Sequence, residues 1–437
     1  MTVMVRICCF LAFFMVSAAA SADSNWSRWR GPRMNGVAPD ADPPLEWSET
    51  KNVVWKVRLP GHGSSTPILW GDRLYVPTAV RVDGLEAPLP SHARKAGESP
   101  PANESTQEFR LLAIDRATGK PIWERTAGTA TPHEGKQENN SYASASALTD
   151  GEHLFAYFGS WGLYCYDLAG ELKWQKDFGD MSTRGGFGEG ASPALHGDTL
   201  VVNWDHEGQS FVVALDKATG EELWRREREE VSSWGTPLVV EVSGRDQVIT
   251  TGTNRVRSYD LKTGDVIWDG PGLTLNAIPS PLESEGILYV TSGFRGSAAY
   301  AVRLADAKGD IESSSAILWR RDRDTPYVPS PLLYHGVFYL VKSNSGILTA
   351  LDAKTGEALF GPERLEPIAE IYASPVAAAG RVYLLGRDGN AMVLASGRKL
   401  EVLAKNSLDD GFDASPVLSG NEMYLRGYRY LYKIAAE

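Results

Sequence analysis

Three consecutive residues in the stretch "NWDHEG", Asp205, His206 and Glu207, are of types that bind metal ions. In an extended segment, alternate side chains point in opposite directions, so only Asp205 and Glu207 readily converge. The spacing fixes no further ligand, and we interpret the stretch as structural. His133 and Glu134 in "TPHEGKQENN" form a similarly weak pair.

Motifs of the common hydrolases, nucleotide-binding proteins and cytochromes are missing: the chain has no H-E-x-x-H, G-x-S-x-G, P-loop or C-x-x-C-H. Four carboxylates recur before a Thr-Gly pair, at Asp115, Asp216, Asp260 and Asp352. An Asp in this place caps a turn through backbone amides, and the Gly supplies a positive φ. These carboxylates are therefore interpreted as turn residues rather than as catalytic groups.

The elements that position these residues repeat along the chain. The pattern A-x-D-x-x-T-G-x-x-x-W occurs, with small variations, at 113–123, 214–224, 258–268 and 350–360, and in shortened form at 165–174. A second repeat, Ser-Pro or Thr-Pro, marks eight unit starts at Thr66, Ser146 (followed by Ala), Ser192, Thr236, Ser280, Ser330, Ser374 and Ser415. Repeats about 40–50 residues long are typical of propellers. The expected fold is all-β, an eight-bladed β-propeller of four-stranded antiparallel blades.

The two ends of the propeller, residues 52–437, are expected to share one blade. The last unit, 413–437, stops after its third strand, whereas 52–59 forms a fourth strand with Trp55 in the repeat position. Pairing them removes two free strand edges. Residues 23–51 are then an N-terminal extension, and the Pro-, Glu- and Ser-rich segment 81–108 is a mobile insertion in the first blade.

Residues 1–22 are typical of a signal peptide, with Arg6 before the apolar run "ICCFLAFFMV" and a cleavage site of small residues. Cys8 and Cys9 lie away from that site, so no lipid anchor is indicated. We expect a periplasmic or secreted monomer without a membrane anchor. Cys165, the one cysteine left after cleavage, is interpreted as a buried thiol.

The chain carries a net charge of −11 at neutral pH. Nucleic acid and anionic lipid attract basic proteins, so an acidic surface argues against both as partners.

The repeat resembles the tryptophan-docking motif of the pyrroloquinoline-quinone-type (PQQ-like) propellers, which include quinoprotein alcohol dehydrogenases and the BamB scaffold of outer-membrane assembly. The stretches "WRGPRMNGVA", "GFGEGASPALHGDTLVVNWDHEGQSF" and "DDGFDASP" are similar to exported BamB-like propellers of planctomycetes. This resemblance spans nearly the whole mature chain. It implies the fold more strongly than it implies a function.

One face of such a propeller carries the loops between blades and the loops joining second to third strands, and the Thr-Gly turns lie on the other. We expect recognition on the first face. The candidate binding residues there are Arg184, Glu189, Trp204, Asp205, His206, Trp234, Asn254, Arg255, Arg295, Tyr327, Lys342, Arg387 and Asp413. Rings, guanidinium groups and carboxylates suit a polar ligand with flat faces, such as a sugar or peptide. They equally suit a salt-bridged rim that contacts protein.

The resemblance implies that a dehydrogenase would hold its quinone beside a disulfide of adjacent cysteines, with calcium on acidic and amide side chains. The mature chain has no adjacent cysteines, although Glu189, Asn254 and Asp413 are possible calcium ligands. The leading hypothesis is a non-catalytic scaffold, without cofactor or metal, that binds a protein or polysaccharide of the cell envelope. The alternatives are a PQQ- and calcium-dependent alcohol or sugar dehydrogenase and a carbohydrate-active enzyme.

Overall fold

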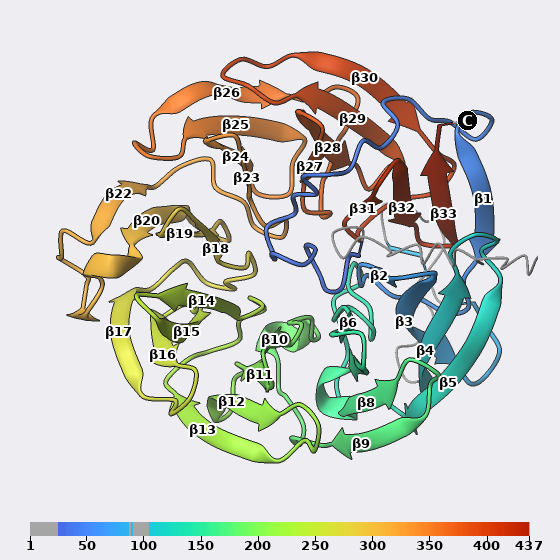
Figure 1. Cartoon of the computed structure of the whole chain (residues 1–437), viewed down its shortest axis with the longest axis horizontal. Coiled ribbons are helices and arrows are strands. Elements are labelled where there is room, and N and C mark those ends of the chain that lie inside the picture. Colours follow the sequence, from blue (N-terminus) through green and yellow to red (C-terminus); the bar gives the residue numbers. More distant parts are fainter. Residues whose placement is uncertain (1–24, 87–88, 91–104, 437) are drawn as a thin grey trace, which may run out of the picture.

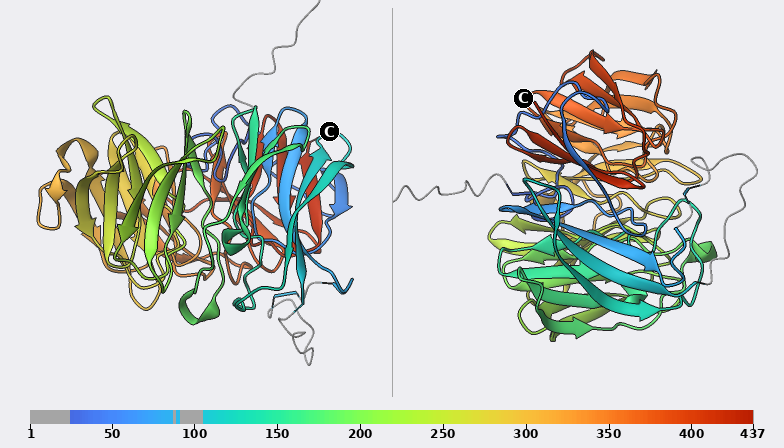
Figure 2. Two further views of the ribbon diagram at one scale, coloured as in Figure 1. Left: turned by 90° about the horizontal axis from the view of Figure 1, so that it is seen from below. Right: turned by 90° about the vertical axis from the view of Figure 1, so that its right-hand side faces the viewer.

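Eight β-sheets stand around a central axis in the computed structural model, which describes residues 25–86, 89–90 and 105–436 (Figure 1). Within each sheet the strands lie side by side, with one edge strand nearest the axis and the other at the outside of the ring. Figure 2 shows the sheets standing upright between two faces of the ring. The predicted eight-bladed propeller is confirmed. None of the described residues belongs to a helix long and apolar enough to cross a membrane.

The first four blades follow one another along the chain. Blade 1 consists of β2 (Ile68–Trp70), β3 (Arg73–Arg81), β4 (Gln107–Asp115) and β5 (Pro121–Ala130). Blade 2 consists of β6 (Leu148–Thr149), β7 (His153–Tyr157), β8 (Leu163–Asp167) and β9 (Leu172–Lys176). Blade 3 consists of β10 (Ala194–His196), β11 (Thr199–Trp204), β12 (Ser210–Asp216) and β13 (Glu222–Arg228). Blade 4 consists of β14 (Leu238–Val242), β15 (Arg245–Thr250), β16 (Arg255–Asp260) and β17 (Val266–Pro271).

The other four blades complete the ring. Blade 5 consists of β18 (Leu282–Ser284), β19 (Ile287–Ser292), β20 (Ala298–Arg303) and β22 (Ile317–Arg321). Blade 6 consists of β23 (Leu332–Tyr334), β24 (Val337–Val341), β25 (Ile347–Asp352) and β26 (Ala358–Arg364). Blade 7 consists of β27 (Val376–Ala378), β28 (Arg381–Leu385), β29 (Asn390–Ala395) and β30 (Val402–Ser407). Blade 8 consists of β31 (Val417–Ser419), β32 (Glu422–Arg426), β33 (Tyr430–Ala435) and β1 (Val53–Arg58).

Blade 8 closes the ring as predicted. β1 pairs antiparallel with β33, from Val53 opposite Ile434 to Arg58 opposite Tyr430. Figure 1 shows β1, in blue, beside β33, in red. The first strand of the propeller therefore completes the blade built by its last residues.

The Ser-Pro repeat has a structural reason that its sequence did not reveal. The backbone N–H of each unit's Ser or Thr donates to the hydroxyl of the next unit, at distances of 2.8 to 3.1 Å. Ser415 of blade 8 donates to Thr66 of blade 1, so the eight hydrogen bonds form a closed ring around the axis. We call these eight side chains the hydroxyl ring.

The repeat Trp residues join neighbouring blades at the outer edge. The indole N–H of Trp224 donates to the Leu261 carbonyl at 2.8 Å, and its ring covers Gly264 of the next Thr-Gly turn. A Cβ at Gly264 would lie only 2.6 Å from that ring, so a larger residue does not fit. The same indole bond is made by Trp55, Trp123, Trp174 and Trp319.

Blade 4 departs from the pattern because its neighbour lacks a Thr-Gly turn. In blade 5 that turn is replaced by a segment containing the short 3-10 helix η5 (Leu304–Asp306) and the strand β21 (Gly309–Asp310). β21 adds to β17 as a fifth, parallel strand, with Gly309 opposite Trp268. Trp268 is fully buried there, and its indole N–H has no partner among the described residues.

The predicted turn role of the repeated carboxylates fits the structure. One oxygen of Asp216 accepts bonds from the backbone of Ala218 and from the backbone and hydroxyl of Thr219. These bonds lower the pKa of Asp216. Cys165 is buried in β8, and burial raises the pKa of its thiol to about 12, as expected for a packing residue.

The N-terminal extension reaches the centre of the ring (Figure 1), and its contact with Gly71, in the turn between β2 and β3, places it on the face that carries the Thr-Gly turns. The Asn25 side chain accepts from the Gly71 backbone, the Arg28 side chain donates to the Leu195 carbonyl, and Val37 bridges to Ala377. Residues 25–37 therefore contact blades on opposite sides of the ring. We call this segment the plug. Most of the predicted insertion 81–108 lies outside the described residues.

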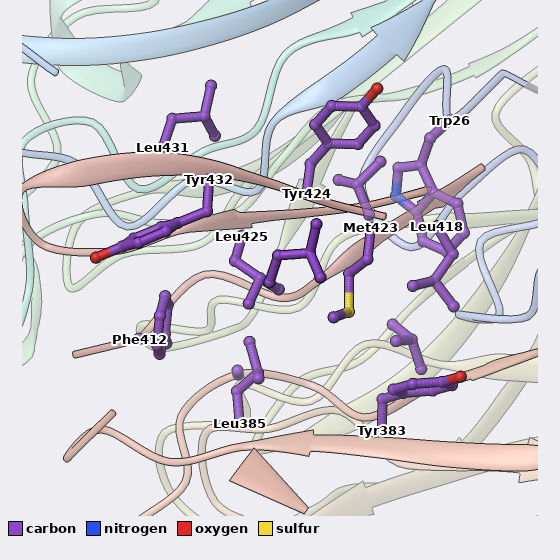
Figure 3. Close-up of a cluster of buried hydrophobic side chains, with 14 of the residues drawn as sticks. Trp26, Tyr383, Leu385, Phe412, Leu418, Met423, Tyr424, Leu425, Leu431 and Tyr432 are labelled. Carbon is purple, nitrogen blue, oxygen red and sulfur yellow. The ribbon is translucent and has the colours of Figure 1, made fainter. Parts of the chain in front are cut away.

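The plug is also part of the core. Trp26 is 1% exposed and packs in a cluster with apolar side chains of blades 7 and 8, including Tyr383, Met423 and Tyr432 (Figure 3). Met34 joins a second cluster with blades 4 and 5. Burial of these side chains fixes the plug against the ring, because removing apolar surface from water is favourable.

Candidate functional site

A cavity of about 370 Å³ occupies the axis of the ring. Its wall is formed by the segments that enter each blade, including six members of the hydroxyl ring, and Trp29 of the plug also lines it. The plug lies on the Thr-Gly face, so the cavity opens on the opposite face, which carries the inter-blade loops. We call this the loop face.

Aromatic rings supply most of the apolar lining. They come from the plug and from five different loops: Trp29, Phe187, Trp234, Phe294, Tyr327 and Tyr372. Phe294 and Tyr327 stack with their ring centres 4.8 Å apart. The indole N–H of Trp234 donates to the Gly188 carbonyl at 2.7 Å, which fixes that ring at the wall.

Among the described residues of the lining, Glu189 is the carboxyl group that forms no ion pair with a Lys or Arg. Its oxygens accept from the backbone and hydroxyl of Ser160, at 2.8 and 2.6 Å. Burial raises the pKa of Glu189 to about 7, although both hydrogen bonds act in the opposite direction. Burial therefore disfavours the charged form of this carboxyl group relative to an exposed Glu.

Asp413, the second carboxyl group of the lining, is paired. Its oxygens lie 2.7 and 3.2 Å from the guanidinium of Arg387, and the Tyr428 hydroxyl donates to it at 3.0 Å. Arg387 lies 3.7 Å from the ring centre of Tyr372. Asp413 therefore adds hydrogen-bonding capacity to the cavity but little net charge.

Of the thirteen predicted residues, four line this cavity: Glu189, Trp234, Tyr327 and Asp413. Arg387 stands behind Asp413 and is 2% exposed. Arg295 is exposed beside Phe294, with its guanidinium 5.3 Å from that ring. Arg184 lies in the short 3-10 helix η4 (Arg184–Gly186) of the loop between blades 2 and 3.

Two predicted residues, Trp204 and Asp205, lie in the interior of blade 3 rather than at the mouth. Trp204 is 2% exposed and packs between Phe178 and Phe211. It was predicted to follow the second strand, but β11 extends through Trp204 and directs this ring into the core. Asp205 is fully buried against Arg228, so its role is structural, as the sequence analysis of "NWDHEG" predicted.

His206 and three more distant residues hold the loops. The imidazole of His206 accepts from the Ser182 backbone at 3.0 Å. The backbone N–H groups of Asn254 and Arg255 donate to Glu230, and Arg255 also lies 3.5 Å from Glu312. Lys342 pairs with Asp324 at 3.0 Å. None of these four residues lines the cavity.

Comparison with known proteins extends over nearly the whole ring. The family described as outer membrane protein assembly factor BamB matches residues 107–275 and 270–436, well over half of the chain. The chain belongs to the BamB family. A BamB of Francisella salina is 28% identical over 102 residues, a match that spans 23% of this chain and 18% of that relative.

Two solved structures share the fold of this BamB-family propeller. BamB from Moraxella catarrhalis has a TM-score of 0.55 at 14% identity, over 82% of this chain and 98% of its own. A quinohemoprotein alcohol dehydrogenase from Pseudomonas putida HK5 has a TM-score of 0.58 at 12% identity, over 94% and 80%. At these identities the likeness establishes the fold alone.

The cavity of this BamB-family chain does not fit the quinone of the dehydrogenases. Pyrroloquinoline quinone is a tricarboxylic acid and is anionic at neutral pH. Among the described residues, the lining contains Glu189 and Asp413 but no Lys or Arg. The suggested calcium ligands do not share the site either: Asn254 lies outside the cavity, and Asp413 is engaged by Arg387.

Sequence reasoning missed the plug, Phe187, Phe294 and the hydroxyl ring as parts of the site. The sequence did contain a sign of the hydroxyl ring. A Ser or Thr recurs before each inner strand, and such a repeat is expected only if the hydroxyl group forms a hydrogen bond. Trp29 lies outside the repeats, and the stretch "WRGPRMNGVA" that begins with it indicated a family resemblance but not a position in the cavity.

A pH-dependent stability is expected from Glu189. Because its folded pKa of about 7 exceeds that of an exposed carboxyl group, the folded state binds more protons between about pH 4.5 and 7, and stability falls as the pH rises through this window. Glu189→Gln removes this loss. The free energy of unfolding in urea is measured for both proteins at pH 4.5 and at pH 8. The difference, variant minus wild type, should be about 2–3 kcal/mol larger at pH 8 than at pH 4.5. An equal difference at both pH values would contradict the assignment.

Proposed function

We propose that this protein is a non-catalytic scaffold of the cell envelope that binds a protein partner through the loop face. The observation that carries the proposal is the contrast between the two faces. The Thr-Gly face is covered at its centre by the plug, and its turns are held by their own carboxylates. The loop face keeps an open mouth with varied side chains around it.

Arg295 and Arg184 are the residues of the loop face best placed for a partner. Arg295 is exposed and Arg184 half-buried, and among the described residues neither forms an ion pair. Arg295 lies beside the stacked Phe294 and Tyr327. Arg and aromatic side chains commonly supply most of the energy of a protein interface.

The family supports a protein partner, since its description is that of an outer membrane protein assembly factor. Residues 1–22, predicted as a signal peptide, lie outside the described residues. We propose a periplasmic or secreted location, a monomeric state and no catalytic role.

The proposal is tested by placing a photo-crosslinking amino acid at position 295 and, as a control, at Lys120 in a Thr-Gly turn. Position 295 should crosslink to a discrete envelope protein, and position 120 should not. Arg184→Glu with Arg295→Glu should weaken binding of that protein by more than about tenfold. Lys120→Glu with Lys262→Glu, on the Thr-Gly face, should leave it unchanged.

The opposite pattern of crosslinks would show that the faces are wrongly assigned. The dehydrogenase alternative has its own assay: the purified protein is incubated with pyrroloquinoline quinone and calcium, and dye reduction is followed with ethanol or glucose. We expect none. Dye reduction that depends on the quinone and the substrate would show that the protein is a dehydrogenase and would overturn the scaffold proposal.

A further inference from the structure

The axial cavity is blind, which limits what can enter it. Trp29 of the plug lines it, and the plug is fixed by the buried Trp26 and by hydrogen bonds to blades 1 and 3. An occupant therefore enters from the loop face and cannot pass through the ring. Because an occupant cannot pass through the ring, the cavity suits the end of a polymer chain better than an internal segment of one.

The wall combines flat apolar surfaces with hydroxyl groups. Six aromatic rings line the cavity, and six hydroxyls of the hydroxyl ring stand among them. Each of these hydroxyl oxygens accepts a backbone N–H, so its own hydrogen is left for another acceptor. Among the described residues, the buried Ser64 hydroxyl at the same wall has no partner.

A ligand matched to this wall has apolar faces and many groups that both donate and accept hydrogen bonds. Sugar rings have both features, with C–H faces that pack on aromatic rings and hydroxyls around the edge. Ligand sites in proteins commonly combine an apolar, aromatic lining with a few placed polar groups in about 300–1,000 Å³. The volume here is at the lower end of that range, enough for roughly one or two sugar rings.

The charge of the wall favours an uncharged occupant. No Lys or Arg is found among the described residues that line the cavity, so an anion finds no counter-charge. Asp413 is neutralised by Arg387. Burial of Glu189 disfavours its charged form, which reduces the attraction of the wall for a cation.

We propose that the blind axial cavity binds the end of an uncharged saccharide chain, with its terminal sugar rings between the aromatic side chains and their hydroxyls bonded to the hydroxyl ring, Ser64 and Glu189. This site goes beyond the proposed protein scaffold. The scaffold uses the rim of the loop face, and the saccharide uses the interior.

Gly190 offers a way to fill the cavity without removing any of its groups. It lines the wall, and a Cβ there would meet Trp234 at 3.5 Å and Ser144 at 3.8 Å, which is ordinary contact. Gly190→Phe therefore places a ring in the space of the ligand. Gly397→Phe is the matched control, since a Cβ at Gly397 meets nothing within 4 Å and this residue lies outside the cavity.

The experiment is calorimetric titration of the full chain at pH 7 with cellobiose, maltotriose and N,N′-diacetylchitobiose. At least one should bind with a Kd of about 1 mM or lower. Digalacturonate, which is anionic, and β-cyclodextrin, which has no chain end, should bind at least about tenfold more weakly. Gly190→Phe should weaken the saccharide by at least about tenfold, and Gly397→Phe should not.

Melting temperatures check that both variants are folded. If Gly190→Phe is not, Phe294→Ala, which removes one ring of the lining, should weaken the saccharide instead. Failure of all three neutral saccharides to bind would overturn the proposal, as would equal binding of β-cyclodextrin or undiminished binding by folded Gly190→Phe. Binding of tetralysine in their place would show a cation site and also overturn it. The crosslinks at position 295 test the protein scaffold separately.

Discussion

Replacing Trp224 with Ala is expected to lower the free energy of unfolding by about 3–5 kcal/mol. The ring is 7% exposed, stacks with Tyr259 and covers Gly264 of the next blade. Its removal leaves a cavity at the joint between blades 3 and 4, and the Leu261 carbonyl loses its indole donor. Urea unfolding followed by circular dichroism measures the change.

Leu223→Ala is the matched control. Leu223 is the preceding residue of the same strand and is 53% exposed, so its truncation should change stability by less than about 0.5 kcal/mol. Equal stability of the Trp224 variant and the wild type would show that this ring does not join the blades.

Asp205→Ala should destabilise the protein by a comparable amount, about 3–5 kcal/mol. Both side chains of the Asp205–Arg228 pair are fully buried, with N–O distances of 2.7 and 3.0 Å. The carboxylate favours the charged guanidinium and raises the pKa of Arg228. Without Asp205, the buried guanidinium loses the carboxylate that is bonded to it, and the hydroxyls of Thr250 and Tyr259 do not replace that charge. Thermal and urea unfolding report the loss.

A surface pair separates burial from charge pairing. Asp265 lies 3.3 Å from Arg226 and is 68% exposed, so Asp265→Ala should cost less than about 1 kcal/mol. A similar loss in the free energy of unfolding for Asp205→Ala and Asp265→Ala would mean that burial does not determine how much the Asp205–Arg228 pair contributes to stability.

The fold was predictable because its signals repeat. A Thr-Gly turn and a Trp recur with fixed spacing, and each contact they make lies within one blade or between adjacent blades. Even the closure by β1 followed from a missing strand at one end and an extra strand at the other. The added strand β21 was not predictable, because it belongs to an irregular segment of blade 5 that follows no repeat.

The site was predictable only in part, because its residues are the ones that do not repeat. Glu189, Trp234, Tyr327 and Asp413 were found from their place before an inner strand. Trp204 was misplaced because one further residue of strand pairing turned a loop position into a core position. Trp29 lines the cavity because the plug contacts distant blades, and a local sequence pattern cannot predict such contacts.

The pairing of β1 with β33 has a consequence for how the protein is made. The two strands stand at opposite ends of the chain, so the contact that completes blade 8 has about the greatest sequence separation the molecule offers, and bringing such distant segments together is slow. A growing chain can form its inner blades in order, but β1 has no partner strand until Tyr430–Ala435 has been synthesised. The bond from Ser415 to Thr66 and the complete wall of the axial cavity depend on the same event. A polypeptide that ends before β33 therefore contains nearly all the blades and still lacks the closed ring.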